Sequence, residues 1–279
     1  MASSMEKTNG ESTIKPNWLE LPLDLTKNIL QRLDSVEIIT SARNVCPMWW
    51  NICKDPFMWR SIDMSNIKLV PFDFRCLDKI CRCGHLEDIA IESFGTDDLL
   101  KHVAHRASNL KRLKISCCNG ITDEGLIKFV TMFSLLEDLQ ISFVYLSKDS
   151  LEVIGQNCPL LNSLYLEVQS GYCILFKLFA DQVFAIAKTM FVLRHLAISG
   201  IWIHDRELLA ILDGCPLLGS LDIPTNIWVN ISESVKKRWQ EQIKDLQLLK
   251  LNYCEEVDDH DVAYKAFFLG TFANDDSEY

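Results

Sequence analysis

The chain has little of what marks a membrane or secreted protein. None of its 279 residues falls in a run of 18 uninterrupted apolar residues, and the most apolar stretch, GYCILFKLFADQVFAIAKTMFVL at 171–193, contains Lys177, Asp181 and Lys188. We therefore expect a buried helix there rather than a membrane span. Residues 1–16 hold no apolar run that could act as a secretory signal, and we expect a disordered tail. These absences predict a soluble protein of the nucleus and/or cytoplasm.

Positive charge is also scarce. The chain has 28 Lys and Arg against 38 Asp and Glu, a formal net charge of -10. Such a surface repels phosphate, which disfavours nucleic acids and anionic membranes as partners and favours a protein.

Cysteine, by contrast, is abundant, with 11 residues. Because the count is odd and no secretory signal is seen, we expect reduced thiols rather than disulfides.

Motifs of catalysis are missing. The sequence contains no G-x-S-x-G, no phosphate-binding P-loop and no H-E-x-x-H. The run CRCGH, with Cys81, Cys83 and His85, lacks a second ligand pair at finger spacing, and His102 and His105 suit a solvated or capping role better than metal binding. We therefore predict no catalytic residue, no metal and no cofactor.

One motif, L-x-x-L-x-L with Ile allowed for Leu, is repeated along most of the chain. It begins at Leu86, Leu110, Leu136, Leu161, Leu193, Leu218 and Leu246, at intervals of 24, 26, 25, 32, 25 and 28 residues. Five of these intervals lie within the period of leucine-rich repeats, and the interval of 32 predicts an insertion near residues 169–173. We expect each motif to form a short strand with its leucines buried.

A helix is predicted after most of these strands. The segments 97–108, 121–133, 148–158 and 206–215 have helical spacing of apolar residues, with Asp or Thr placed to cap the first turn. Three positions after the last apolar residue of the strand, leucine-rich repeats place Asn or Cys, which satisfies backbone groups of the turn. Cys118, Asn226 and Cys254 hold this position, whereas the other four repeats do not keep it.

The run LKRLKISCCNGITDEGLIKFV at 110–130 resembles the cysteine-containing subclass of leucine-rich repeats. The resemblance covers residues 85–265 and implies an α/β solenoid of about seven irregular strand-helix repeats. Cys158-Pro159 and Cys215-Pro216 would each close a helix before the next strand. A small apolar thiol packs well against leucines, so we expect these cysteines to be structural. Residues 266–279 are expected to form an acidic tail.

Residues 17–64 carry no such repeat and are predicted to be a separate, all-α module, joined to the repeats by a linker or capping segment at 65–84. Pro22 begins a first helix, and Asp34 with Glu37 suits the start of a second helix that continues through Trp49. The module displays four Trp, at 18, 49, 50 and 59, in under fifty residues. A unit of this size cannot bury them all, so some are expected to contact a partner.

This module resembles the F-box, through Leu21-Pro22, Val45-Cys46-Pro47-Met48-Trp49, and Trp59 followed by Ile62-Asp63-Met64. Pro47 and Met48 depart from the family, which usually has polar or basic residues there. A proline inside a helix costs on the order of 3 kcal/mol unless it lies in the first turn. This departure questions the straightness of the second helix and the affinity for an adaptor.

An F-box followed by leucine-rich repeats resembles the plant F-box/LRR-repeat proteins, which implies a non-catalytic substrate receptor of an SCF-type (Skp, cullin, F-box) ubiquitin ligase. The F-box would bind a Skp-family adaptor and through it the cullin and RING subunits. The repeats would bind a protein substrate. The expected adaptor contacts are Leu21, Pro22, Leu25, Ile29, Leu30, Leu33, Val45, Trp49 and Trp59, about half of which could equally be internal core.

The expected substrate contacts alternate with the buried strand leucines and therefore point out of the inner surface of the solenoid. They are Asp88, Glu92, Arg112, Lys114, Asp138, Gln140, Tyr165, Glu167, His195, Asp222 and Lys250. Each of them could also be an ordinary solvated residue. Two alternatives stay open: an F-box/LRR interaction scaffold without ligase activity, and, less favoured, an enzyme or small-molecule receptor built on the solenoid.

Overall fold

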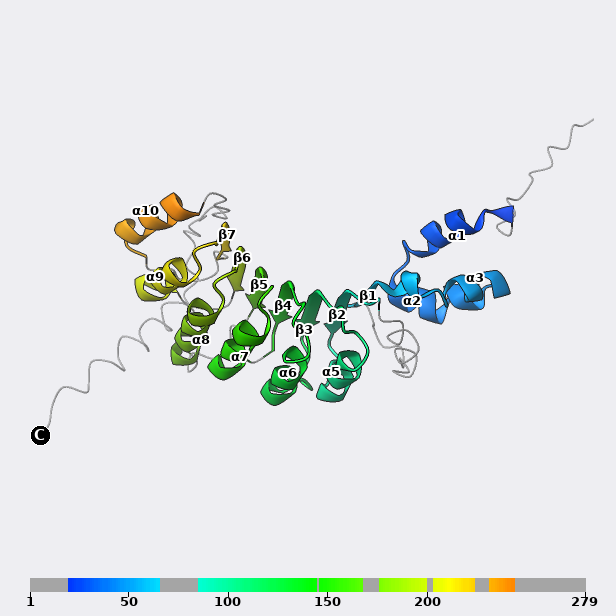
Figure 1. The fold of residues 1–279 in the computed structure, drawn as a ribbon, viewed down its shortest axis with the longest axis horizontal. Helices are drawn as coiled ribbons and strands as arrows, with labels where there is room; N and C mark the ends of the chain where they lie inside the picture. Colours follow the sequence, from blue (N-terminus) through cyan, green and yellow to red (C-terminus); the bar gives the residue numbers. More distant parts are fainter. Residues whose placement is uncertain are drawn as a thin grey trace, which may run out of the picture.

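Strands and helices alternate along an open arc. The computed structural model describes residues 20–65, 85–144, 146–167, 176–199, 203–223 and 231–243, with the backbone alone for 176–179. The strands line the inner side of the arc, and the helices lie on its outer side (Figure 1). A small helical module lies at one end of the arc, next to the strand β1. The expected solenoid preceded by a helical module is confirmed.

The helical module consists of short helices separated by tight turns. These are α1 (Leu23–Leu30), α2 (Ser35–Thr40), the 3-10 turn η2 (Ala42–Asn44), α3 (Pro47–Ile52) and the 3-10 turn η3 (Pro56–Trp59). Asp34 caps α2, since its side chain accepts a hydrogen bond from the Glu37 amide at 2.7 Å. The predicted N-cap is therefore confirmed, but the predicted continuous second helix is wrong, because it is divided into α2, η2 and α3.

Pro47 causes no break inside a helix. It occupies the first position of α3, where its fixed φ suits the helix and its missing amide is not needed. Cys46 precedes it in an extended conformation and caps α3, with its Sγ 3.5 Å from the Trp49 amide nitrogen. The concern that Pro47 distorts this helix is thereby removed.

All the described strands belong to one parallel sheet in chain order. They are β1 (Ser61–Met64), β2 (Asp88–Glu92), β3 (Arg112–Ser116), β4 (Asp138–Ser142), β5 (Ser163–Glu167), β6 (His195–Ser199) and β7 (Ser220–Asp222). The six strands β2 to β7 lie at the first six L-x-x-L-x-L motifs, as predicted. The seventh motif, with Leu246 and Lys250, lies outside the described residues, as do Asn226, Cys254, residues 168–175 and both chain ends.

The first strand was not predicted. Residues 61–64 were expected to close an all-α module, but they form β1 and pair in register with residues 88–91 of β2. Ile62 and Met64 are fully buried, and the Asp63 amide donates to Ser35 Oγ of α2 at 3.1 Å. The helical module is thus joined to the solenoid through a strand of the common sheet. Residues 66–84 of the predicted linker or capping segment lie outside the described residues.

The outer helices are α5 (Asp97–Ala104), α6 (Asp123–Val130), α7 (Lys148–Asn157), α8 (Phe176–Thr189), α9 (Asp205–Gly214) and α10 (Glu233–Gln242). α5, α6 and α7 fall inside the segments predicted from helical spacing, and α9 begins one residue before its predicted segment. α8 falls inside the apolar stretch expected to be a buried helix. In the part of the chain that the structure describes, no helix is both long and apolar enough to span a membrane.

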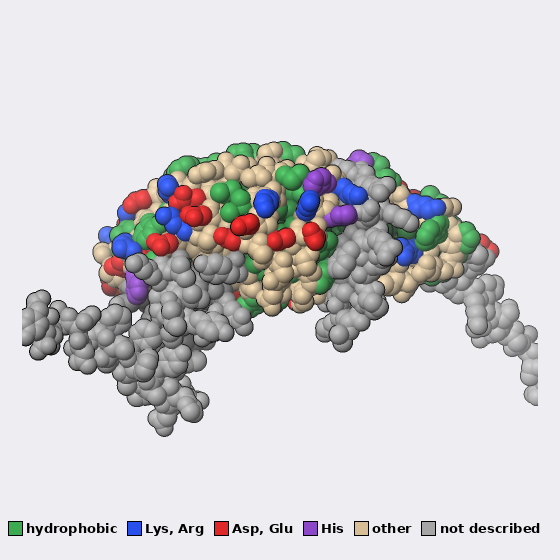
Figure 2. Space-filling view, turned by 90° about the horizontal axis from the view of Figure 1, so that it is seen from below, with side chains coloured by type: hydrophobic (Ala, Val, Ile, Leu, Met, Phe, Trp, Pro, Cys, Tyr) green, Lys and Arg blue, Asp and Glu red, His purple; other side chains and the backbone are tan. Residues whose placement is uncertain are grey.

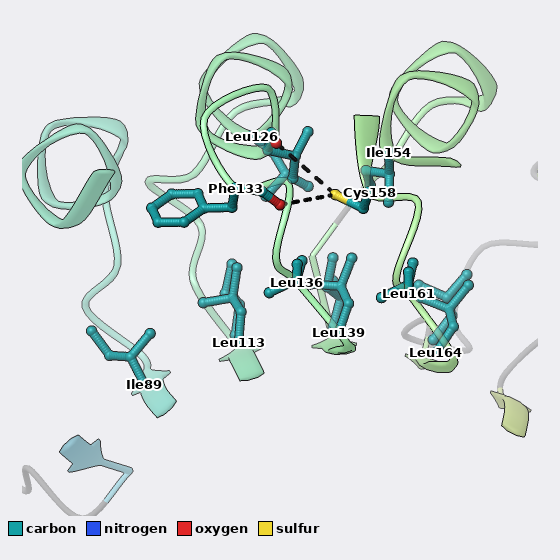
Figure 3. Close-up of a cluster of buried hydrophobic side chains, with 14 of the residues drawn as sticks. Ile89, Leu113, Leu126, Phe133, Leu136, Leu139, Ile154, Cys158, Leu161 and Leu164 are labelled. Carbon is teal, nitrogen blue, oxygen red and sulfur yellow. Dashed lines mark hydrogen bonds between the residues drawn. The ribbon is translucent and has the colours of Figure 1, made fainter. Parts of the chain in front are cut away.

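The core runs between the sheet and the helices. In-register residues such as Ile89, Leu113, Leu139 and Leu164 are almost fully buried and form a continuous row across neighbouring strands (Figure 3). Full burial of one such side chain contributes about 1.5–3 kcal/mol. The repetition of this row explains why the sequence keeps Leu or Ile at a fixed place in each repeat.

The cysteines of the C-P-x-L segments are part of this core. Cys158 and Cys215 end α7 and α9 and are almost completely buried. The Cys158 Sγ lies 3.6 Å from the Phe133 carbonyl oxygen, across from the preceding repeat (Figure 3). Burial raises the pKa of both thiols to about 11, so they stay protonated and unreactive at neutral pH. Their expected structural role is consistent with this setting.

Hydrogen bonds also connect the helix N-termini of successive repeats. The Asp97 carboxylate of α5 accepts from the Thr122 amide at 2.8 Å, and Asp205 of α9 accepts from the Ser232 amide at 2.8 Å. Asp123 of α6 accepts from the Ser147 amide at 3.0 Å and from two serine hydroxyls of α7 and its cap. We call these contacts the capping ladder, because an acidic residue in one helix holds the N-cap of the next.

Candidate functional site

The helical module exposes hydrophobic side chains that a small soluble unit would ordinarily bury. Leu25, Ile29, Val45 and Pro22 are exposed, as the predicted adaptor contacts require. The other predicted contacts at the surface, Leu21, Leu33 and Trp49, are half-buried.

Two predicted adaptor contacts belong to the core instead. Leu30 is 0% exposed and Trp59 is 4% exposed, and the Trp59 indole donates to the Cys53 carbonyl at 2.8 Å. Because neither side chain reaches the surface, their assignment as direct contacts is wrong in this conformation. Both are part of the hydrophobic core.

Three exposed hydrophobic residues were missed. Leu23, Trp50 and Phe57 are as exposed as the predicted contacts. Two cations lie close to the Trp50 ring, with the Lys54 Nζ 5.1 Å and the Arg43 Cζ 5.7 Å from its centroid. Hydrophobic and basic side chains occur together at this end of the molecule (Figure 2). The Trp49-Trp50 pair signalled such a face, but helical spacing did not show which ring points outward.

The inner face of the sheet presents the side chains that alternate with the buried leucines. Of the predicted substrate contacts, Arg112, Lys114 and His195 are exposed. The half-buried members are Asp88, Glu92, Asp138, Gln140, Tyr165, Glu167 and Asp222. All of these lie on one face as predicted, since their strands pair in register. Lys250 lies outside the described residues.

Charge is unevenly distributed on this face. Arg112 and Lys114 stand on β3, where Arg112 Nη2 is paired with Asp88 Oδ2 of β2 at 2.7 Å. On β4, desolvation raises the pKa of Asp138, against the opposing effects of hydrogen bonds from Gln140 and Ser163 and of the Arg112 charge. The strands from β4 onward carry Asp138, Glu167 and Asp222. The inner face is therefore basic at β3 and acidic toward β7.

Tyr165 is an aromatic side chain in the middle of the acidic half. Its hydroxyl donates to Glu167 Oε2 at 3.1 Å. Desolvation raises the pKa of Tyr165, and the Glu167 and Asp222 charges raise it further. The phenol and the Glu167 carboxylate are therefore neighbours on the inner face.

Nothing in the described residues gathers three metal-ligating side chains. Cys81 and Cys83 lie outside the described residues. His85 stacks on Phe57 with ring centroids 4.7 Å apart, and the His105 Nδ1 lies 2.7 Å from the Lys101 carbonyl oxygen of its own helix. These histidines are thus engaged in packing and in helix capping.

Comparison with known proteins agrees with this architecture. Residues 18–61 match the family model of the F-box domain. The chain is 42% identical to the F-box protein SKIP19 of Arabidopsis thaliana over 242 residues, which cover 84% of this chain and 77% of that protein. This chain belongs to the plant F-box/LRR-repeat proteins.

A second relative, F-box/LRR-repeat protein 23 of Arabidopsis thaliana, is 41% identical to this chain over 257 residues. The match covers 88% of this chain but only 57% of that relative, so the chain spans little more than half its length. Among solved structures, a chain of the yeast Rad7 and Elc1 complex matches with a TM-score of 0.49 and 15% identity, covering 79% of this chain and 66% of that one.

Proposed function

We propose that this F-box/LRR-repeat protein is the substrate-recognition subunit of an SCF-type ubiquitin ligase. The observation that carries the proposal is the surface of the F-box, where Leu23, Leu25, Val45 and Phe57 are exposed over a buried support. A hydrophobic surface of this kind on so small a unit suits helix-on-helix docking with a Skp-family adaptor. Cullin and RING subunits would join through that adaptor.

The repeats would hold a protein substrate on the inner strand face. The protein would then act by tethering, because a bound substrate is kept near the ubiquitin-charged enzyme carried by the other subunits. Tethering raises the effective concentration of the reacting groups without any catalytic residue in this chain. A nuclear and/or cytoplasmic location is part of this proposal.

The scaffold alternative, an F-box/LRR protein without ligase activity, rests on the altered segment VCPMWW at 45–50. Pro47 begins α3 and so does not distort a helix, but Pro47 and Met48 still differ from the polar or basic residues usual in the family. The alternative nevertheless makes a different prediction. A scaffold would bind its partner without supporting ubiquitin transfer when adaptor, cullin and RING subunits are all supplied.

Leu25→Arg tests the adaptor surface. Leu25 is 47% exposed, so the substitution leaves the core intact while placing a charge on the docking face. We expect binding to a purified Skp-family adaptor to weaken by at least about tenfold, because desolvating an unpaired charge in an interface costs more than 1.4 kcal/mol. The measurement is isothermal titration calorimetry.

The matched control is Leu217→Arg. Leu217 is a leucine of similar exposure, 49%, in the turn between α9 and β7, far along the arc from the F-box (Figure 1). It should leave adaptor binding unchanged. Equal loss in both variants, or none in Leu25→Arg, would contradict the docking assignment.

A further inference from the structure

Small and large residues alternate on the inner face at one point of the acidic half. Tyr165 of β5 pairs in register with Ala197 of β6, and Ala197 pairs with Asp222 of β7. Neighbouring strands are about 4.8 Å apart, so Tyr165 and Asp222 stand roughly 10 Å apart across the methyl group of Ala197. We call this position, where a small side chain lies between two larger ones, the Ala197 notch.

The walls of the Ala197 notch are an aromatic ring and carboxylates. Tyr165 forms one wall, with Glu167 hydrogen-bonded to its hydroxyl. Asp222 forms the other wall. The Asp222 Oδ1 is shielded from solvent and accepts no hydrogen bond from the described residues, which leaves a buried acceptor without a donor.

We propose that the Ala197 notch binds a basic side chain, arginine or lysine, from an extended segment of the protein substrate. The proposal deepens the proposed function and rests on it. A cation placed over the Tyr165 ring gains a cation-π contact. It can donate hydrogen bonds to Asp222 and Glu167, and charge-assisted bonds of this kind are about twice as strong as neutral ones.

Charge elsewhere on the face directs such a segment to this place. Lys114 and Arg112 on β3 would repel a basic residue, whereas Asp138, Glu167 and Asp222 attract it. The exposed His195 of β6 stands two residues before Ala197, at the edge of the notch. The overall charge of -10 would also favour the approach of a basic partner.

The test uses a fluorescein-labelled glycine-serine peptide carrying spaced arginines, and the same peptide with citrulline in place of arginine. Citrulline keeps the shape but removes the charge. Fluorescence anisotropy with the full chain at about 150 mM salt should show binding of the arginine peptide alone. No binding of the arginine peptide up to about 1 mM would overturn the proposal.

Two pairs of variants separate the notch from general attraction. Glu167→Gln with Asp222→Asn removes two charges at the notch, whereas Glu124→Gln with Asp149→Asn removes two exposed charges on the outer helices. Only the first pair should weaken binding, by about tenfold. Equal weakening by both pairs means unspecific attraction and overturns the proposal.

A third pair of variants tests whether the peptide needs the space beside Ala197, without changing the charge of the inner face. Ala197→Leu fills the notch and should abolish peptide binding, whereas Ala90→Leu makes the same change at the equivalent position of β2 and should not. Both alanines are half-buried on the inner face. Unchanged binding in Ala197→Leu would overturn the proposal.

Lys250 of the chain itself could compete with the peptide for the notch, because in the next L-x-x-L-x-L motif it holds the place that Asp222 holds in its own motif. Lys250→Gln should leave affinity within about twofold; a tenfold gain would mean that the chain's own lysine competes for the notch and would overturn the proposal. Adaptor binding is measured on every variant. If adaptor binding persists while the peptide fails to bind, this inference fails and the proposed function does not.

Discussion

Gly214, the last residue of α9, lies directly against the backbone of α8. A Cβ atom at this position would overlap the carbonyl oxygen of Ala187, and no change of side-chain rotamer can relieve a clash with backbone. Here glycine is required by the close approach of two helices. The neighbouring Gly219 has room, since its nearest atom would be 3.8 Å from an added Cβ.

Gly214→Ala is therefore expected to lower the free energy of unfolding by about 1–3 kcal/mol, since the helices must separate to admit the methyl group. Gly219→Ala should change it by less than about 0.5 kcal/mol. Urea denaturation followed by circular dichroism measures both. Equal stability of the two variants would show that α8 yields more easily than its packing indicates.

At the same scale, alternation along a strand predicted correctly which residues face the inner surface, because a side-chain period of two leaves only two choices. In the F-box, helical spacing and the family resemblance pointed to Leu30 and Trp59 as adaptor contacts, but both side chains are buried. A short helix surrounded on several sides buries more than one stripe, and spacing alone cannot tell a core residue from a docking residue.

At the scale of elements, the capping ladder couples α5 to α6, α6 to α7 and α9 to α10. Asp123 and Asp149 both lie in the first turn of a helix, where a carboxylate interacts favourably with the helix dipole. Asp123 also accepts hydrogen bonds from the cap of the following helix, whereas Asp149 accepts none from the part of the chain that the structure describes.

Asp123→Ala is expected to destabilise the protein by about 1–3 kcal/mol, because the Ser147 amide and two hydroxyls lose their acceptor. Asp149→Ala, the control, should cost under about 1 kcal/mol. Hydrogen exchange should show faster exchange at the start of α7 in the first variant alone. Identical exchange in both variants would remove the role assigned to the ladder.

The elements themselves divide into those that the sequence predicts and those that it does not. The regular Leu and Ile positions predicted β2 to β7, since burial of the same row in each repeat demands the same spacing. β1 carries only Ile62 and Met64, too few apolar residues to form the motif, so the pattern that predicted the other strands does not mark it. The capping ladder likewise joins residues about 25 positions apart.

At the scale of the whole molecule, ion pairs and hydrogen bonds to carboxylates are spread along the arc. The Lys27 ammonium lowers the pKa of Asp55 in the F-box, Arg60 lowers that of Glu87 at the junction, and Ser232 lowers that of Asp205 near α10. A lowered pKa in the folded state adds stability above the unfolded pKa values of 3.8 and 4.5. That stability is lost as the pH falls through the folded values.

We therefore expect the urea midpoint to fall between about pH 5 and pH 3. Asp138 acts in the opposite sense, because its raised pKa favours protonation in the folded state. Among the described carboxylates, the three lowered pKa values of Asp55, Glu87 and Asp205 outnumber this one raised value. Tryptophan fluorescence and circular dichroism both follow the transition, and four of the seven tryptophans lie in the F-box module. A midpoint that stays constant or rises on acidification would contradict the expected sign.

The shared strand β1 gives the molecule a fixed reach. Its four residues continue the chain of the F-box and at the same time pair with β2, so the two parts cannot swing about a free hinge. Under the proposed function, the span between the adaptor and a substrate held at the Ala197 notch is then a constant length. The substrate lysine that receives ubiquitin would then be selected by its distance from the bound segment, and not by the amino-acid sequence around that lysine.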